Sequence, residues 1–320
     1  MFSRAACAIL AGLSLIAAMP AAQAEQPVSI VLGYTAGGTT DTIARVIAQR
    51  LQEKIGKTVI VEDKPGAAAQ IASRYVAKSA PDGLTLQIAT QTSHAAGQRL
   101  YANPGYDPVK DFTPISLVAY TPLVLVANKE FPPNSVKELI DYIKARPGAV
   151  NYATGGRGDG ADLAGLFFNK EAGVNAVAVP YQGDGAAMPA VLGNHVSYMF
   201  VSAPTAMSGI GTGLIKPLAV TGTTRLPALP NIPTMQEAGI KDFDVELWWG
   251  MFGPAGMAPD LVASLNKAVN EVLKEPDTLK KLNELGYVVK GTTAQEFSDY
   301  VKSENVKWAD ILKNQGIATK

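Results

Sequence analysis

Residues 34–41, YTAGGTTD, and residues 152–159, YATGGRGD, decide the fold, because a tyrosine, a glycine pair and an aspartate recur in both stretches at the same spacing. In each stretch a predicted strand runs into the tyrosine and a helical pattern follows the glycine pair, which predicts two strand–loop–helix units. The glycines allow a sharp turn and leave room for a ligand beside the backbone. Each following helix presents unpaired N–H groups and the positive end of its dipole, so the pair of loops predicts an anion site.

The two loops are expected to face each other across a cleft, one from each lobe. Each follows a strand, at the edge where open α/β sheets usually bind their ligands. Ordinary strand-to-helix turns without a ligand are the alternative interpretation for either loop alone, whereas the matched pair favours a shared site. The ligand-binding residues expected in the two loops are Tyr34, Gly37, Gly38, Thr39, Thr40, Thr154, Gly155, Gly156, Arg157, Gly158 and Asp159.

Charged residues in this region allow two interpretations each. Arg157 can take a carboxylate bidentately, or it can point into solvent. Asp41 and Asp159 would repel an anion, so we expect each to cap its helix by accepting backbone N–H groups. The alternative is that Asp159 or Asp184 holds the amino group of a ligand.

Loops after the other predicted strands supply further candidates by the same logic. His94 can donate a hydrogen bond to a carboxylate, or it can belong to a structural loop. Trp248 and Trp249 can cover an apolar ligand, or they can lie in the core. The further ligand-binding candidates are Gln91, Thr92, Ser93 and His94 in one loop, Tyr181 with Gln182 in a second, and Ser202 in a third.

Short β-branched runs alternate with helical patterns along most of the chain. Alternation of this kind is typical of parallel sheets with helices on their faces. Capping boxes at Ser135-x-x-Glu138 and Thr293-x-x-Glu296 each predict the start of a helix. We expect strands at 28–32, 59–61, 84–89, 123–127, 151–154, 176–179, 196–200 and 218–221, and a mainly helical segment beyond Trp248.

Two weak boundaries divide the chain, one near residues 120–122 and one in the proline-rich stretch at 226–233 and the strand after it. We expect one discontinuous lobe made of residues 25–121 and 236–320, and a second lobe made of residues 122–235. At least two crossings would join these lobes, which is a hinge geometry. A single long sheet is the alternative.

The composition excludes several classes of protein. The 320 residues include 28 Lys+Arg against 28 Asp+Glu, and 47% of them are hydrophobic. This balance lacks the basic excess that nucleic-acid backbones require and the low hydrophobicity of a disordered chain. We therefore expect a globular protein without a nucleic-acid partner.

Residues 1–24 have the pattern of a secretory signal peptide. Arg4 precedes an apolar run at 5–18, and Ala22-Gln23-Ala24 provides a cleavage site after Ala24. A membrane anchor is the alternative, but it would need roughly 20 apolar residues. Cleavage would remove Cys7, the only cysteine, so the exported chain would contain no disulfide. We expect no stable membrane insertion of the mature chain.

Signatures of common enzyme classes are absent from the sequence. It contains no Gly-x-Ser-x-Gly elbow, no phosphate-loop motif and no His-Glu-x-x-His motif. Two histidines, and no cysteine after the signal peptide, leave few groups for catalysis near neutral pH. We expect binding without chemistry, and neither a cofactor nor a metal.

The chain resembles the Bug or TctC-type extracytoplasmic solute receptors of tripartite tricarboxylate transporters over nearly its whole mature length. The resemblance implies a two-lobed, type II-like periplasmic binding protein fold, each lobe a mainly parallel sheet flanked by helices, with a hinge and a central cleft. It also implies that the lobes close on an organic acid and deliver it to a membrane permease of one large and one small subunit. The motifs that carry it are YTAGGTTD at 34–41, VEDKPGA at 61–67, APDGLTL at 80–86, YDPVKDF at 106–112, NYATG at 151–155, VPY at 179–181 and LPNIPT at 229–234.

The resemblance further implies that the loop at 34–40 holds one ligand carboxylate, partly through ordered water, and that the loop at 154–159 serves the second lobe. This second loop departs from the family pattern. Where the family often has Gly-x-Gly-Thr/Ser and then HLAGE, this chain has GRGD at 156–159 and DLAGL at 162–166, and Gln182 stands where lysine is common. With Arg157 available for a second carboxylate, we expect a dicarboxylate or an aromatic acid as ligand.

Two other functions are compatible with the sequence. One is an exported lyase or isomerase that uses Asp159 and His94 across the same cleft. The other is a sensor that binds the same acid but signals to a histidine kinase instead of supplying a permease.

Overall fold

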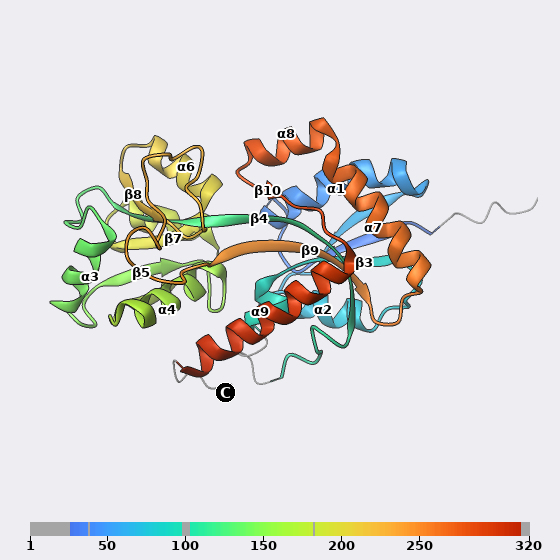
Figure 1. Ribbon diagram of the computed structural model, residues 1–320, viewed down its shortest axis with the longest axis horizontal. Coiled ribbons are helices and arrows are strands. Elements are labelled where there is room, and N and C mark those ends of the chain that lie inside the picture. Colours follow the sequence, from blue (N-terminus) through green and yellow to red (C-terminus); the bar gives the residue numbers. More distant parts are fainter. Residues whose placement is uncertain (1–25, 38, 98–102, 182, 315–320) are drawn as a thin grey trace, which may run out of the picture.

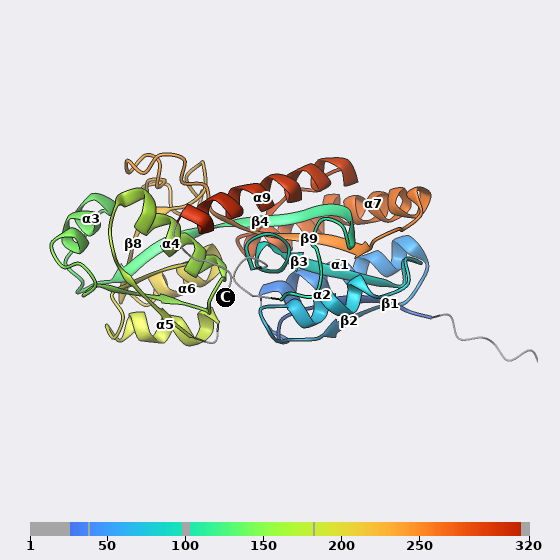
Figure 2. The same ribbon diagram turned by 90° about the horizontal axis from the view of Figure 1, so that it is seen from below.

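The computed structural model describes residues 26–37, 39–97, 103–181 and 183–314. The expected signal peptide, Gly38 and Gln182 lie outside these ranges. Within the ranges, no helix combines the length and the apolarity that a bilayer span requires. Figure 1 shows an elongated molecule of two lobes, and Figure 2 shows the same molecule from below.

The first lobe begins with alternating strands and helices. β1 pairs in parallel with β2 on one side and with β3 on the other. The apolar stripe of α1, which includes Ile43, Ile47 and Leu51, is fully buried and packs in the same cluster as Ile30 and Leu32 of β1. These elements are β1 (Val28–Leu32), α1 (Thr39–Ile55), β2 (Val59–Asp63), α2 (Gln70–Ala77), β3 (Thr85–Thr90) and the π-helical turn η1 (Thr92–Ala96).

The second lobe repeats the strand–helix plan. β5 pairs in parallel with β6 and with β7. The stacked rings of Tyr152 and Tyr198 lie on these paired strands, with 5.5 Å between their centroids. The elements are α3 (Val136–Lys144), β5 (Asn151–Thr154), α4 (Gly160–Ala172), β6 (Val177–Pro180), α5 (Asp184–Leu192), β7 (Tyr198–Ser202), α6 (Ala203–Gly211) and β8 (Ile215–Val220).

Two long strands, β4 (Phe112–Asn128) and β9 (Glu246–Pro254), join the lobes (Figure 1). β4 pairs antiparallel with β9 as far as Pro122, and from Leu123 onward it pairs antiparallel with β7 and β8. β9 also pairs antiparallel with β3. The strand order is therefore β2-β1-β3-β9-β4-β7-β5-β6, with parallel strands at both ends and antiparallel strands where the lobes meet.

The last part of the chain returns to the first lobe. α7 packs against α1 and β4, and β10 adds to the edge of β4. α9 begins with a reciprocal capping box, because Thr293 and Glu296 each donate a backbone N–H to the other's side chain, at 2.9 and 3.1 Å; this box confirms the sequence prediction. These elements are α7 (Pro259–Lys274), α8 (Pro276–Glu284), β10 (Val288–Val289) and α9 (Ala294–Asn314).

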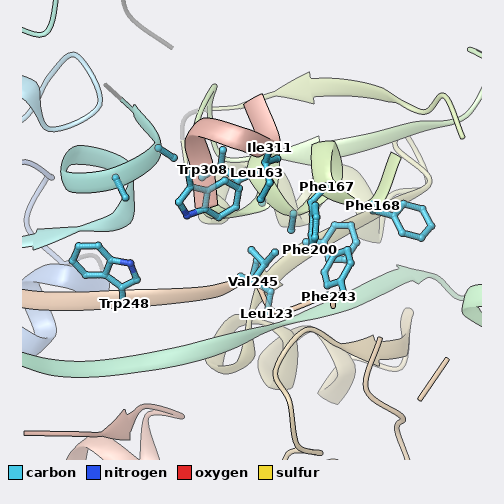
Figure 3. Close-up of a cluster of buried hydrophobic side chains, with 14 of the residues drawn as sticks. Leu123, Leu163, Phe167, Phe168, Phe200, Phe243, Val245, Trp248, Trp308 and Ile311 are labelled. Carbon is cyan, nitrogen blue, oxygen red and sulfur yellow. The ribbon is translucent and has the colours of Figure 1, made fainter. Parts of the chain in front are cut away.

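An apolar cluster continues from one lobe into the other along α9. Figure 3 shows Trp308 and Ile311 of α9 beside Leu163 of α4, and all three belong to one buried cluster. The indole N–H groups of Trp248 and Trp308 both donate to Oε2 of Glu304, at 3.2 and 3.1 Å. α9 therefore connects the crossing strand β9 with the second lobe.

Two strands differ from the sequence expectation. The strand expected at 123–127 begins at Phe112, because shifts of register on either side of Leu117 accommodate Pro114 within the pairing. A strand was expected after the proline-rich stretch at 226–233, but β9 continues past Trp248 into the segment that we expected to be mainly helical. Its residues from Trp248 to Pro254 are buried without alternation, so the period-two pattern of a half-exposed strand is missing.

Candidate functional site

A cavity of about 520 Å³ lies between the two lobes. The first lobe contributes the loop after β1, the start of α1 and the end of β3. The second lobe contributes the starts of α4 and α5, and the crossing strands supply apolar side chains. The described residues that line the cavity are Tyr34, Thr35, Ala36, Gly37, Thr39, Thr40, Thr90, Gln91, Thr92, Leu123, Asp159, Gly160, Ala161, Gly183, Asp184, Gly185, Thr205, Leu247 and Trp249.

Three helices begin at this cavity. Thr39 and Thr40 open α1, Gly160 and Ala161 open α4, and Asp184 and Gly185 open α5. The first N–H groups of a helix have no partner within the helix, and its dipole places partial positive charge at the same end. Helices from both lobes therefore create an environment suited to a small anion.

Hydroxyl groups line the wall formed by the first lobe. The hydroxyl oxygens of Tyr34 and Thr90 are hydrogen-bonded at 2.6 Å, and burial raises the pKa of Tyr34. The indole N–H of Trp249 donates to Oγ1 of Thr40 at 2.9 Å, which fixes both side chains. The neutral tyrosine, with the hydroxyls of Thr39 and Thr40, provides hydrogen-bond donors without a charge.

Asp41, which lies in the first turn of α1, is directed away from the cavity. Its carboxylate accepts the backbone N–H of Gly37 at 2.9 Å and forms an ion pair with Arg45 at 2.8 Å. The hydrogen bonds with Arg45 and Gly37 lower the pKa of Asp41. Asp41 is the third residue of α1 rather than its N-cap, so the expected capping role is replaced by a bond back to the loop.

Two carboxyl groups line the wall formed by the second lobe. Asp159 is the N-cap of α4, as the sequence predicts, and accepts the backbone N–H of Asp162 at 2.8 Å. Burial, and the neighbouring charge of Asp184, raise the pKa of Asp159 well above its usual value. Burial also raises the pKa of Asp184 to about 6, although hydrogen bonds from the backbone and hydroxyl of Ser202 oppose the shift.

The cavity brings together only part of the predicted site. Gly38 lies outside the described residues. Ser93, Thr154, Gly155, Gly156, Gly158, Tyr181 and Ser202 are not among the lining residues, although Ser202 supports Asp184 from behind. The predicted residues that do line the cavity are Tyr34, Gly37, Thr39, Thr40, Thr92 and Asp159, together with Gln91, Asp184 and Trp249, which were further or alternative candidates.

His94 and Arg157 both lie away from the cavity. The ring of His94 is fully buried between Phe112 and Phe252, with centroids 4.4 and 4.3 Å away, and its Nδ1 is bonded to the Ser93 hydroxyl. Burial lowers the pKa of His94 to about 3, so the ring is neutral. Arg157 is exposed on the loop before α4. The geometry thus offers no support for the ligand contacts expected of these two residues.

The two glycine loops have equivalent positions in the structure, but these are not the positions that match in the repeated sequence pattern at 34–41 and 152–159. Tyr34 follows β1 and reaches the cavity, whereas Tyr152 lies within β5 and points into the core. The bond from Gly37 to Asp41 has its counterpart in the bond from Gly158 to Asp162, at 2.8 Å. Asp162, and not Asp159, is therefore the structural equivalent of Asp41.

Several lining residues were missing from the predicted site. Gly183 and Gly185 follow the parallel strand β6, so the same strand-end logic that selected the other loops applies to them. Asp184, between them, was suggested from the sequence only as an alternative partner for an amino group. Leu247 lies on β9 and was missed because the bounds of that strand were not predicted, whereas Trp249, also on β9, was named as a possible cover for an apolar ligand. Thr205, on α6, has no sequence signal that we can identify.

Comparisons with known proteins show to which family this chain belongs. Residues 43–317 match the family model described as the tripartite tricarboxylate transporter family receptor, TctC. This chain belongs to that receptor family. Protein BugT of Bordetella pertussis is 31% identical over 296 residues, which cover 92% of this chain and 91% of BugT.

Solved TctC-type structures share the whole fold. R. palustris Rpa4515 with adipate is 34% identical, with a TM-score of 0.84, over 92% of this chain and 98% of that one. MatC from Rhodopseudomonas palustris with bound malate is 32% identical, with a TM-score of 0.81, over 89% of this chain and 98% of that one. The TctC receptor fold therefore covers nearly all of the chain, including both walls of the cavity.

Proposed function

We propose that this TctC-family receptor captures a small organic carboxylate between its lobes in the periplasm and delivers it to a membrane permease with a large and a small integral subunit. The observation that carries the proposal is the interlobe cavity at which α1 from one lobe meets α4 and α5 from the other. The bound adipate of Rpa4515 and the bound malate of MatC support the same ligand class. Export would follow from a signal peptide cleaved after Ala24.

The ligand carboxylate is proposed to bind at the first turn of α1. Thr39 and Thr40 offer amides and hydroxyls there, and the carboxylate of Asp41 is paired with Arg45 and with the N–H of Gly37. Hydrogen bonds to a charged group are worth about 1.5 to 3 kcal/mol each, so four of them supply roughly 6 to 12 kcal/mol before ordering costs. Micromolar affinity requires about 8 kcal/mol. Neither a metal nor a cofactor is needed in this proposal.

The proposed lobes follow the pairing of the crossing strands. β4 changes partners between Pro122 and Leu123, close to the boundary expected after residue 121. Phe243 packs against Phe167 and Phe200 of the second lobe, with centroids 5.0 and 6.0 Å away. We therefore propose that the second lobe extends to about Val245 and that closure bends the chain at these two crossings.

Binding without turnover is part of the proposal. The enzyme alternative placed Asp159 and His94 across one cleft, but His94 is enclosed by Phe112 and Phe252. A screen of adipate, malate, succinate and benzoate by thermal shift and calorimetry tests the proposal. A bound acid should raise the melting temperature and be recovered unchanged by mass spectrometry. Failure of every carboxylate in a wider panel, or steady conversion of the bound acid, would contradict it.

A side chain at Gly185 tests the location of the site. Gly185 lines the cavity, and a Cβ placed there meets no atom within 4 Å. Gly185→Val should therefore project into the cavity and weaken acid binding about tenfold or more, with little change in unfolding temperature. Gly211→Val is the matched control, because Gly211 is also helical and open but lies outside the cavity. Equal affinities in both variants would place the ligand elsewhere.

Uptake measurements test delivery to the permease. Cells that lack the receptor should lose uptake of the labelled acid, wild-type receptor should restore it, and Gly185→Val should restore it poorly. Unchanged uptake in cells without the receptor would contradict a transport role.

A further inference from the structure

The two walls of the interlobe cavity differ in charge. On the wall of the first lobe, donors at Thr39 and Thr40 face the cavity, and the nearby carboxylate of Asp41 is paired with Arg45. On the wall of the second lobe, Asp159 and Asp184 both face the cavity. The cavity therefore has a wall of hydrogen-bond donors opposite an acidic wall, with the apolar side chains of the crossing strands between them.

The acidic wall has no cation among the described residues. No lysine, arginine or histidine is found in the described lining, and neither Asp159 nor Asp184 forms an ion pair with a described residue. Arg157, which lies on the loop before α4, is exposed, and its charge acts on Asp162, which is not a lining residue. Two like charges in a partly desolvated place are costly unless a positive group joins them.

Asp159 and Asp184 make the N-terminal ends of α4 and α5 less suitable for binding an anion. Asp159 already occupies the N–H of Asp162 in the first turn of α4, and Asp184 is itself the first residue of α5. A ligand carboxylate at these two helices would meet carboxylates from the protein. The same carboxylate at α1 would meet amides and hydroxyls. The favoured orientation thus places the negative end of the ligand at α1 and leaves the opposite end beside Asp159 and Asp184.

We infer that the ligand carries a protonated amino group in addition to its carboxylate, and that Asp159 and Asp184 receive this ammonium group at the wall of the second lobe. This inference rests on the proposed function and narrows its ligand class from organic acids to amino acids and related aminocarboxylates. The ammonium supplies the cation that the described cavity lacks, and its N–H groups match two carboxylate acceptors.

A competing use of the same residues makes a different prediction. If Asp159 and Asp184 bound protons, they could donate hydrogen bonds to a second carboxylate, and the ligand would be a dicarboxylate without an amino group. Deaminated acids would then bind more tightly at low pH than at neutral pH. The groups that act on the pair are Asp162 on α4, Tyr34 after β1, Tyr152 on β5 and Ser202 at the end of β7.

The test compares acids that differ only in the amino group. Calorimetry with purified wild-type protein near neutral pH would use the pairs succinate and aspartate, glutarate and glutamate, butyrate and 4-aminobutyrate, and 3-phenylpropionate and phenylalanine. The tightest aminocarboxylate should bind about ten- to hundredfold more tightly than its partner, as expected for charge-assisted hydrogen bonds. Equal or tighter binding of the deaminated partners would overturn the inference and leave the proposed function intact. Binding of no acid at all would overturn both.

Substitutions then test whether the two aspartates cause the preference for an aminocarboxylate over its deaminated partner. Asp184→Asn and Asp159→Asn keep an acceptor oxygen but remove the charge, so each should reduce the preference for the amino partner about tenfold. Asp162→Asn is the matched control, because Asp162 lies on the same helix and bonds Gly158 but does not line the cavity. Circular dichroism verifies the fold, and if Asp159→Asn does not fold, Asp184→Asn decides alone. An unchanged preference in the folded variants would overturn the inference.

Discussion

Asp159 and Asp184 lie together on one wall of the cavity, and no described cation accompanies them. Their raised pKa values have the same first cause, burial, and the charge of Asp184 adds to the shift of Asp159. In the ligand-free protein, negative charge on these buried carboxylates lowers the free energy of unfolding. A bound ammonium group would offset this destabilisation. The residues that recognise a ligand need not be residues that stabilise the empty receptor.

Asp184→Asn should stabilise the ligand-free protein near neutral pH. The folded pKa of Asp184, about 6, lies above its ordinary value of 3.8, so folding takes up a proton between these values. Wild-type stability therefore falls as pH rises from about 4 through about 6, whereas the asparagine variant lacks this loss. The difference in the free energy of unfolding should be near zero at about pH 4 and about 1 to 3 kcal/mol in favour of the variant at about pH 7.5. Urea titrations at the two pH values measure it.

A constant difference between the two proteins at both pH values would show that the charge of Asp184 is not the cause. Asp162→Asn provides a comparison from the neighbouring helix, since its carboxylate also has a raised pKa but accepts the Gly158 N–H.

Residue roles were predictable where they depend on local chemistry. Asp159 as an N-cap follows from its position before a helical pattern, and the structure confirms it. The position of Asp41 within α1 and the enclosure of His94 between two phenylalanines depend on contacts that no local spacing encodes. Arg157 is adjacent in sequence to residues of the site, but it is exposed and does not line the cavity.

Helices and strands could be predicted where the sequence shows a regular repeat of apolar residues. α1 shows its buried stripe every four residues, and the short parallel strands show β-branched runs. The continuation of β9 past Trp248 was missed because it is buried on both faces, and its Gly250 leaves space that the ring of Phe297 fills. The start of β4 was missed because Pro114 normally argues against a strand, and here a shift of register accommodates it.

Among the elements, α9 is expected to couple the lobes most strongly. Trp308 is 1% exposed in the cluster that extends to α4, and its indole bonds Glu304. Trp308→Ala should lower the free energy of unfolding by about 3 to 5 kcal/mol. Val306→Ala is a control on the same helix, because Val306 is 63% exposed and should change stability by less than about 0.5 kcal/mol. Chemical denaturation that finds similar costs for both variants would contradict the coupling role of α9.

At the scale of the whole molecule, two lobes share one strand order that passes through β9 and β4. The glycine loops and the family motifs were sufficient to predict two lobes of the TctC type. They were not sufficient to predict the walls of the cavity, because the first-lobe wall includes β3 residues and the second-lobe wall includes α5 residues that are distant in sequence. Those walls exist only once the crossing strands bring the lobes together.

The most direct test of the account is a crystal structure of the protein with the acid that stabilises it most. The account predicts density in the interlobe cavity, with carboxylate oxygens within hydrogen-bond distance of the first-turn amides or hydroxyls of α1 at Thr39 and Thr40. An acid bound outside this cavity, or with its carboxylate turned away from α1, would contradict it.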